Sequence, residues 1–315
     1  MEIQTRLLSH PARAFAWMLA AQVFFALMAV GARIGGRALP WQEVCASRFI
    51  FGGLTVFVAA RLQGQSLRVL NVRAARWRSA YGTLSAAGTF YLYATPKLPI
   101  GDAATLLATA PLFVAVLGIP ILGEPVRGVL ALALVGGFAG IGLVAEPSFA
   151  SSGLLVALGT ATALASALAF IALRRVGPGE SSEAVVFHFA VVGSVTMLLA
   201  CIPVWRLPNV TDGVALLATG IFGGFAQIMM TRAYALDNAA RVSALGYSGV
   251  VFTRALAVPL FGELPSAMRV AGSLLVVASG VAIALSSSSD VCRRSRTDPG
   301  GPADGRPHSG DGQSA

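Results

Sequence analysis

The chain has 315 residues, of which 56% are hydrophobic and only 12% are charged. Soluble domains carry about 25% charged residues, and this composition therefore excludes an ordinary soluble protein. The net charge of +9 comes almost entirely from arginine, since Lys97 is the single lysine. These arginines gather between the apolar stretches, which explains the charge without a nucleic-acid partner.

Ten apolar stretches follow one another, each close to the roughly 20 residues that a helix needs to cross a bilayer. Helices satisfy every backbone group within one segment, whereas a β-barrel would show alternating segments of about ten residues. We therefore predict an all-α integral membrane protein with ten transmembrane helices. The predicted spans are 14–33, 42–61, 79–96, 102–122, 127–146, 153–173, 184–204, 213–233, 242–261 and 267–286.

Residues 14–147 and 153–286 form two copies of one five-span unit, with an offset that stays between 139 and 141 residues. Single identities between apolar helices arise by chance, but a near-constant offset does not. Because five is an odd number, the second copy must lie upside down relative to the first, as in many secondary transporters. Matched pairs are Arg33 with Arg174, Phe49 with Phe189, Gly82 with Gly223, Tyr93 with Tyr234, and Glu124 with Glu263.

The arginines between the spans predict the orientation in the membrane. With the N-terminus in the cytoplasm, sixteen Lys and Arg residues lie inside, Arg78 among them, and six lie outside. Basic residues favour the cytoplasmic side, so we place both termini there and the protein in the inner membrane. The first span follows Arg6 and Arg13 like a signal peptide, but its counterpart at 153–173 argues against its removal.

Outside the spans, the sequence predicts little chemistry. The segment 287–315 is polar and rich in Gly, Pro and Ser, which is typical of a disordered tail that is either solvated near anionic lipid or regulatory. Cys45, Cys201 and Cys292 form no C-x-x-C pair, and the three histidines are scattered, so we expect neither a disulfide framework nor a metal or cofactor. Lys97 follows a proline, so no P-loop exists.

Small residues and one proline predict local helix geometry. Gly136 with Gly140, and Gly220 with Gly224, form G-x-x-x-G pairs suited to close helix crossings. Pro111 lies in the middle of the fourth span and should kink it, either as a plain bend or as part of a cavity or gate.

A Gly-Tyr-Ser-Gly stretch at residues 246–249 is similar to the motif of intramembrane serine proteases. A serine nucleophile needs a base within hydrogen-bond reach. His188 precedes Ser248 and His308 lies in the tail, so the order expected of such a protease is absent. An intramembrane enzyme is nevertheless the alternative function, and close helix packing is the structural one.

The membrane part, residues 14–286, resembles a ten-helix member of the drug/metabolite transporter superfamily, of the EamA-like branch. The resemblance rests on the five-plus-five layout, Arg48 in the second span, and Tyr-Ala at Tyr93 and Tyr234. It also rests on P-x-x-G-E at 120–124 and 259–263. It implies gradient-linked movement of small metabolites, commonly outward. The second copy departs from the pattern because His188 stands where the first has Arg48.

Polar residues at membrane depth are the candidate substrate contacts. Arg254 lies roughly eight residues from the outer end of its span; it either snorkels to the surface or pairs with an anion in a cavity. Gln22 and Gln227 lie mid-span, where amides bond either a neighbouring helix or a substrate. Tyr247 lies two turns from Arg254 on the same face, and forms an aromatic wall or plain packing.

Further candidates lie nearer the membrane surfaces. Arg48 is about one turn inside the outer surface and binds substrate, snorkels, or pairs with Glu43 or Asp102. Tyr93 is included as a substrate contact. His188 is a candidate for proton coupling because a free imidazole titrates near neutral pH, or else a bonded interfacial histidine. Glu124 and Glu263 are expected to stabilise the start of the helix that follows each of them.

These observations favour a secondary transporter that exports small metabolites or amino-acid-like compounds by alternating access, and not an enzyme. Its expected partners are a small-molecule substrate and the bilayer, with no nucleic acid. The sequence leaves the substrate, the coupling ion and the oligomeric state open.

Overall fold

The computed structural model describes residues 10–95, 98, 100–124, 126, 128–145, 152–177, 179–261 and 266–297, without the side chains of 10, 100–102, 145, 254, 257, 258, 261 and 283–297. All regular structure in these ranges is helical. The helices are α1 (His10–Gly35), α2 (Trp41–Leu62), α3 (Val72–Ala94), α4 (Ile100–Leu107), α5 (Ala110–Leu122), α6 (Val129–Ala145), α7 (Gly153–Val176), α8 (Ser182–Cys201), α9 (Val210–Leu236), α10 (Ala239–Leu245), α11 (Ser248–Phe261) and α12 (Ala267–Thr297).

These twelve helices make the ten predicted spans, because the fourth span of each repeat is broken into two. Within the described ranges, six stretches are by themselves long and apolar enough to cross a membrane, among them 103–122, which bridges α4 and α5. The breaks fall at Ala108–Thr109 and at Gly246–Tyr247, which lie within one residue of matched positions in the two repeats. The predicted kink at Pro111 is therefore a full interruption, and Pro111 lies in the first turn of α5, where its missing N–H is not needed.

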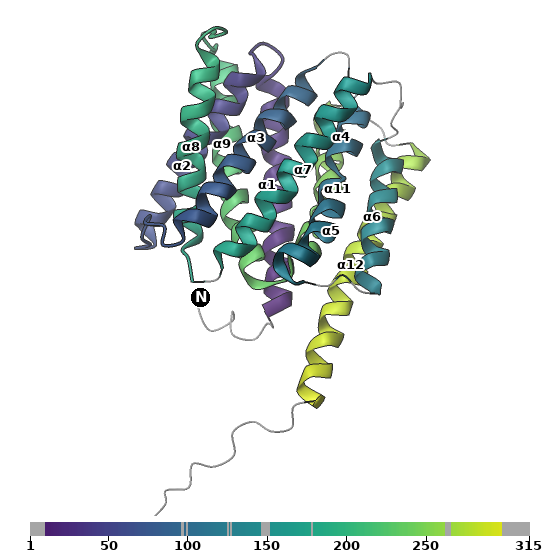
Figure 1. Ribbon diagram of the computed structural model, residues 1–315. Helices are drawn as coiled ribbons and strands as arrows, with labels where there is room; N and C mark the ends of the chain where they lie inside the picture. Colours follow the sequence, from purple (N-terminus) through teal and green to yellow (C-terminus); the bar gives the residue numbers. More distant parts are fainter. Residues whose placement is uncertain are drawn as a thin grey trace, which may run out of the picture.

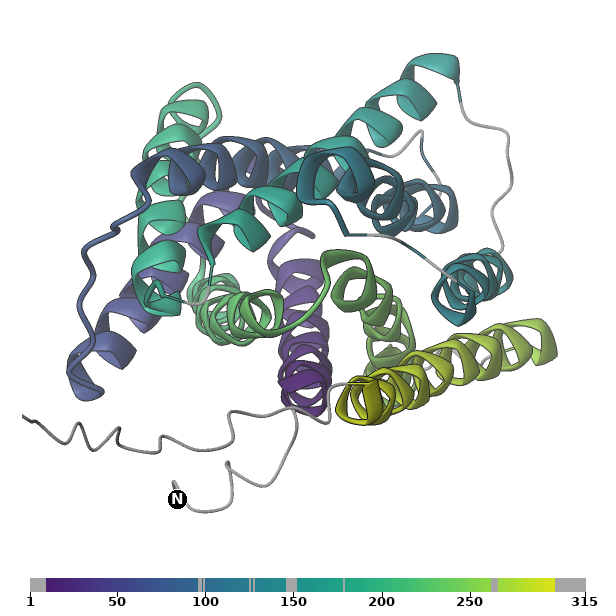
Figure 2. The same cartoon turned by 60° about the horizontal axis from the view of Figure 1, so that its bottom comes forward.

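The two repeats have an approximate two-fold relation, and the helices of one repeat pack against those of the other. The first helix of each repeat packs on the third helix of the other, α1 on α9 and α7 on α3. The second helices, α2 and α8, contact each other at one edge of the bundle, and the fifth helices, α6 and α12, contact each other at the opposite edge (Figures 1 and 2). The matched rings of Phe49 and Phe189 meet edge to face, with centroids 5.1 Å apart.

The predicted glycine pairs lie at close helix crossings. A Cβ on Gly140 would lie 2.9 Å from the carbonyl oxygen of Gly272, and one on Gly224 would lie 2.9 Å from that of Gly52. Real Cβ atoms do not tolerate such distances to backbone, so these positions require glycine for α6 to reach α12 and for α9 to reach α2.

The ends of the bundle are called here the lower face, where α1 begins, and the upper face, where it ends (Figure 1). Asparagine or serine side chains cap several helices: Asn71 accepts from the N–H of Ala74, and Asn209 from that of Asp212, which satisfies otherwise unpaired donors. The cap at Asn71 starts α3 seven residues before the predicted span. Arg73, Arg76 and Arg78 are therefore helical, and α12 continues to Thr297, beyond the predicted end at 286. Residues 298–315 of the predicted tail lie outside the described part.

Candidate functional site

A cavity of about 350 Å³ lies between the two repeats and is lined by every helix except α6 and α12. Both broken spans border it at their interruptions, through Leu107 and Ala108 on one side and Gly246 and Tyr247 on the other. Broken helices at the repeat interface leave backbone groups free to face a ligand, which is how many transporters build their binding site. Its volume is that of a small-molecule site.

Five of the seven predicted site residues line this cavity: Gln22, Arg48, Tyr93, Gln227 and Tyr247. They come from α1, α2, α3, α9 and the interruption before α11, so the fold brings together positions up to 225 residues apart in the chain. Arg254 falls in α11, but its side chain lies outside the described residues. His188 does not line the cavity; its Nδ1 lies 2.8 Å from Oγ of Ser79 in α3.

Arg48 is buried inside the protein, with 9% of its surface exposed. Its guanidinium carbon lies 5.1 Å from the ring centroid of Phe49 and 5.8 Å from that of Phe189. Its Nε and Nη1 atoms are buried and have no hydrogen-bond partner among the residues that the structure describes. The predicted pairing with Glu43 is wrong, because Glu43 accepts from the backbone N–H of Arg206 at 2.5 Å. The side chain of Asp102 lies outside the described residues.

The predicted location of Arg78 is wrong, because this residue was counted among the arginines of the loops between the predicted spans. It lies on α3, is 3% exposed and lines the cavity. Its Nη2 donates to Oε1 of Gln227 at 2.9 Å, and its guanidinium lies 4.2 Å from the ring centroid of Phe189. A Cβ on Gly82, one turn further along, would lie 2.0 Å from its Nη1. Arg78 and Gly82 are four residues apart and therefore lie on one face of α3.

Gln22 and Tyr247 lie at the interruption of the second broken span. A Cβ on Gly249 would lie 2.3 Å from Oε1 of Gln22, so the missing side chain makes room for that amide. The ring of Tyr247 packs on Gly137 of α6. Tyr247 is 4% exposed, and its hydroxyl has no hydrogen-bond partner.

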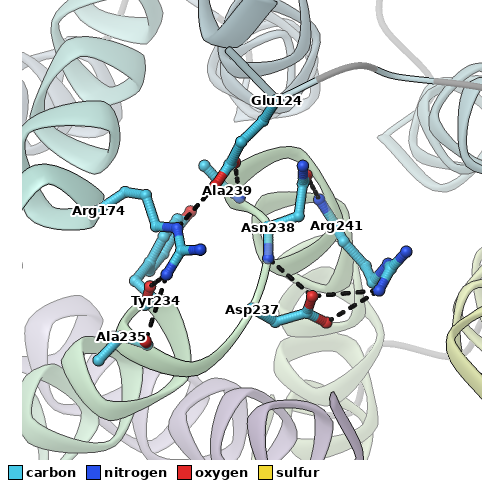
Figure 3. Close-up of polar contacts among 8 residues, drawn as sticks. All are labelled: Glu124, Arg174, Tyr234, Ala235, Asp237, Asn238, Ala239 and Arg241. Atoms are coloured by element: carbon cyan, nitrogen blue, oxygen red, sulfur yellow. Dashed lines mark hydrogen bonds and ion pairs between the residues drawn. The ribbon is translucent and has the colours of Figure 1, made fainter. Parts of the chain in front are cut away.

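Below the cavity, a polar cluster joins the two repeats at the lower face (Figure 3). Arg174 of α7 donates from Nε to Glu124 at 2.8 Å and from Nη1 to the carbonyl oxygens of Tyr234 and Ala235, both at 3.2 Å. The other oxygen of Glu124 accepts from the N–H of Ala239 at 2.7 Å. Glu124 therefore stabilises the start of α10 in the other repeat, and the prediction that it serves the next helix in sequence is wrong.

The two ends of the cavity differ at matched positions. Tyr234, next to the lower cluster, is fully buried at 0% exposed, whereas Tyr93, its counterpart at the upper end of α3, is 46% exposed. Both line the cavity. Arg174 is partly buried in the cluster, and its counterpart Arg33 is exposed. At these matched positions the lower end of the cavity is therefore more enclosed by protein than the end near Tyr93.

The protease-like stretch lacks the required geometry. The hydroxyl of Ser248 donates to the carbonyl of Leu245 at 2.7 Å, and His188 contacts Ser79 on another helix pair. Ser248 therefore caps the interruption of the span and has no histidine base from His188. Cys45 and Cys201 are free and buried, and no group of potential metal ligands occurs among the described residues.

The fold and cavity define a ten-helix membrane protein built from two inverted repeats, with a small-molecule site between them. The description "EamA-like transporter family" matches this chain twice, at residues 12–145 and 151–285. The chain belongs to that family, within the drug/metabolite transporter superfamily.

Comparisons with known proteins agree with this class. The chain is 28% identical over 265 residues to the pseudopaline exporter CntI of Pseudomonas aeruginosa, covering 82% of this chain and 91% of that protein. It is 24% identical over 277 residues to a riboflavin transporter of Vibrio cholerae, covering 86% and 92%. A solved crystal structure shares the fold, with a TM-score of 0.77 at 18% identity, covering 90% of this chain and 98% of that one. This chain is thus a small-molecule transporter of the membrane.

Proposed function

We propose that the protein is a secondary transporter that exports small metabolites by alternating access, with no enzymatic activity. The observation that carries this proposal is the cavity between inverted repeats, bordered by both broken spans. The exporter named among its relatives supports outward movement. The arginine distribution supports a cytoplasmic lower face with both termini on that side, in the inner membrane.

Alternating access requires two closures that do not open together. The cluster of Glu124, Arg174 and the start of α10 is the cytoplasmic closure in this proposal. Because Glu124 belongs to the first repeat and both of its partners to the second, its contacts must break when the repeats separate at the lower face. The structure then corresponds to the outward-facing state, in which substrate leaves past Tyr93.

The cavity residues take the substrate in this proposal. Gln22, Gln227, Tyr247, Arg48 and Tyr93 form its polar and aromatic wall, and Arg254 is retained as a contact from α11. His188 is retained as the proton-coupling group, acting through Ser79 on α3 rather than at the cavity itself.

Export is tested by untargeted metabolite analysis of the medium from cells that overproduce the protein, with cells lacking it as the reference. A compound that accumulates outside in a protein-dependent way is then loaded into proteoliposomes. Saturable efflux and counter-exchange are expected of a carrier. A conversion of the compound without flux would support the enzyme alternative and overturn the proposal.

A further inference from the structure

The charge inside the cavity points to one class of substrate. Two arginines, Arg48 and Arg78, line the cavity, and among its described lining residues none is an aspartate or glutamate. A buried guanidinium without a carboxylate costs several kcal/mol in a medium of low dielectric constant. Side chains kept at that cost mark a site where a negative charge binds.

Arg48 supplies the first half of this site. It is buried, and the phenyl rings of Phe49 and Phe189 contact its cationic group without neutralising it. Nε and Nη1 of this guanidinium are buried and have no hydrogen-bond partner among the described residues. Each can donate a charge-assisted hydrogen bond to an oxygen of a carboxylate.

Arg78 supplies the second half. Both guanidinium groups contact the ring of Phe189. The guanidinium carbon of Arg48 lies 5.8 Å from the ring centroid, and that of Arg78 lies 4.2 Å from it. Gln227 holds the Nη2 edge of Arg78, and a neutral amide leaves the charge in place. The two positive charges thus face one ligand volume from α2 and α3.

The remaining wall is apolar and aromatic, with isolated hydroxyl groups and the neutral amide of Gln22. The unpartnered hydroxyl of Tyr247 and the side chain of Ser243 approach from the second broken span. A cavity of about 350 Å³ holds a small organic molecule and not a lipid with two acyl chains.

We propose that the transported compound is a small organic dianion, with one acid group on Arg48 and the other on Arg78. This inference rests on the proposed transport function and names its substrate class. A cationic substrate would meet two like charges and no carboxylate among the described lining residues. A neutral one would leave both guanidinium charges buried and uncompensated.

The test is ligand-induced thermal stabilisation of the full-length protein in detergent, with three probes of one chain length. Glutarate carries two negative charges, glutaramate carries one, and 1,5-diaminopentane carries two positive charges. At matched ionic strength, glutarate is expected to stabilise, glutaramate to bind about tenfold more weakly because one charge-assisted bond is lost, and the diamine to have no effect. Sulfate at equal concentration controls for simple anion binding.

Variants sharpen the result. Arg48→Gln and Arg78→Gln should each reduce glutarate to the level of glutaramate, while Arg206→Gln, a charge removed from an exposed upper loop, should change nothing. Overturning outcomes are no effect of glutarate on the unmodified protein, an effect matched by the diamine, or one reproduced fully by sulfate. These readouts use binding alone, so they fail or succeed separately from the flux measured for the proposed function.

Discussion

Tyr93 and Tyr234 occupy matched positions in the two repeats, yet one is 46% exposed and the other 0%. The sequence around them is similar, since each tyrosine is followed by alanine. What differs is the surrounding contact set: the carbonyls of Tyr234 and Ala235 accept from Arg174, which also holds Glu124. The same repeat unit is therefore compatible with two different environments, one exposed and one buried. Exchange of a transporter between an upper and a lower opening requires that the two repeats can take either environment.

The largest expected effect comes from removing the charge that joins the repeats. Glu124→Gln should weaken the bond to Arg174 and the cap on α10, favour opening at the lower face, and lower net export about tenfold or more. Export from proteoliposomes or cells measures this. Asp237→Asn is the matched control, because Asp237 pairs with Arg241 within the second repeat at 3.1 Å. Equal effects of the two variants would show that bridging the repeats has no special role.

A smaller effect is expected where matched glycines face different arginines. A Cβ on Gly82 would lie 2.0 Å from Nη1 of Arg78, whereas one on Gly223 would lie 3.1 Å from Sδ of Met28 and 3.4 Å from Cγ of Arg48. Gly82→Ala should therefore displace the Arg78 guanidinium and reduce transport several-fold, on the order of 1 kcal/mol, while Gly223→Ala stays near normal. Transport rates at equal membrane abundance decide this. The reverse order would contradict the placement of Arg78.

The smallest effect is expected from a change at His188, the counterpart of Arg48 in the second repeat. His188 lies outside the cavity lining and contacts Ser79, so His188→Gln should leave substrate affinity unchanged. If His188 carries the coupling proton, the same variant should flatten the dependence of transport on pH. Initial rates across a pH series measure both quantities. An unchanged pH profile would remove His188 from the coupling mechanism.

Much of the fold was predictable because hydropathy and the constant repeat offset do not depend on tertiary detail. The ten spans and the inverted repeats followed from them, and so did the candidates Gln22, Gln227 and Tyr247, since polar groups at membrane depth need a partner. Arg78 was misplaced for the same reason: a hydropathy window ends a span where arginines begin, and only the cap at Asn71 extends α3 past them.

The polar cluster at the lower face could not be predicted from the sequence, for a different reason. Glu124 contacts a backbone N–H 115 residues away, and Arg174 contacts two backbone carbonyls. Backbone partners leave no residue-type signal, so the pattern at 120–124 indicated a motif repeated within the chain but not the contacts of its glutamate. The interruption of the broken spans was likewise hard to predict. Pro111 indicated a kink in the first repeat, and no residue was singled out for the second.

Side-specific labelling at the matched tyrosines tests the central claim most directly. Tyr93→Cys and Tyr234→Cys are made in a chain freed of its three cysteines and treated with an impermeant thiol reagent from either side of the membrane. The account predicts that position 93 reacts from outside and position 234 is protected, and that adding Glu124→Gln exposes position 234 to the cytoplasm while protecting position 93. Reaction of both positions from the same side, or no change on adding Glu124→Gln, would contradict it.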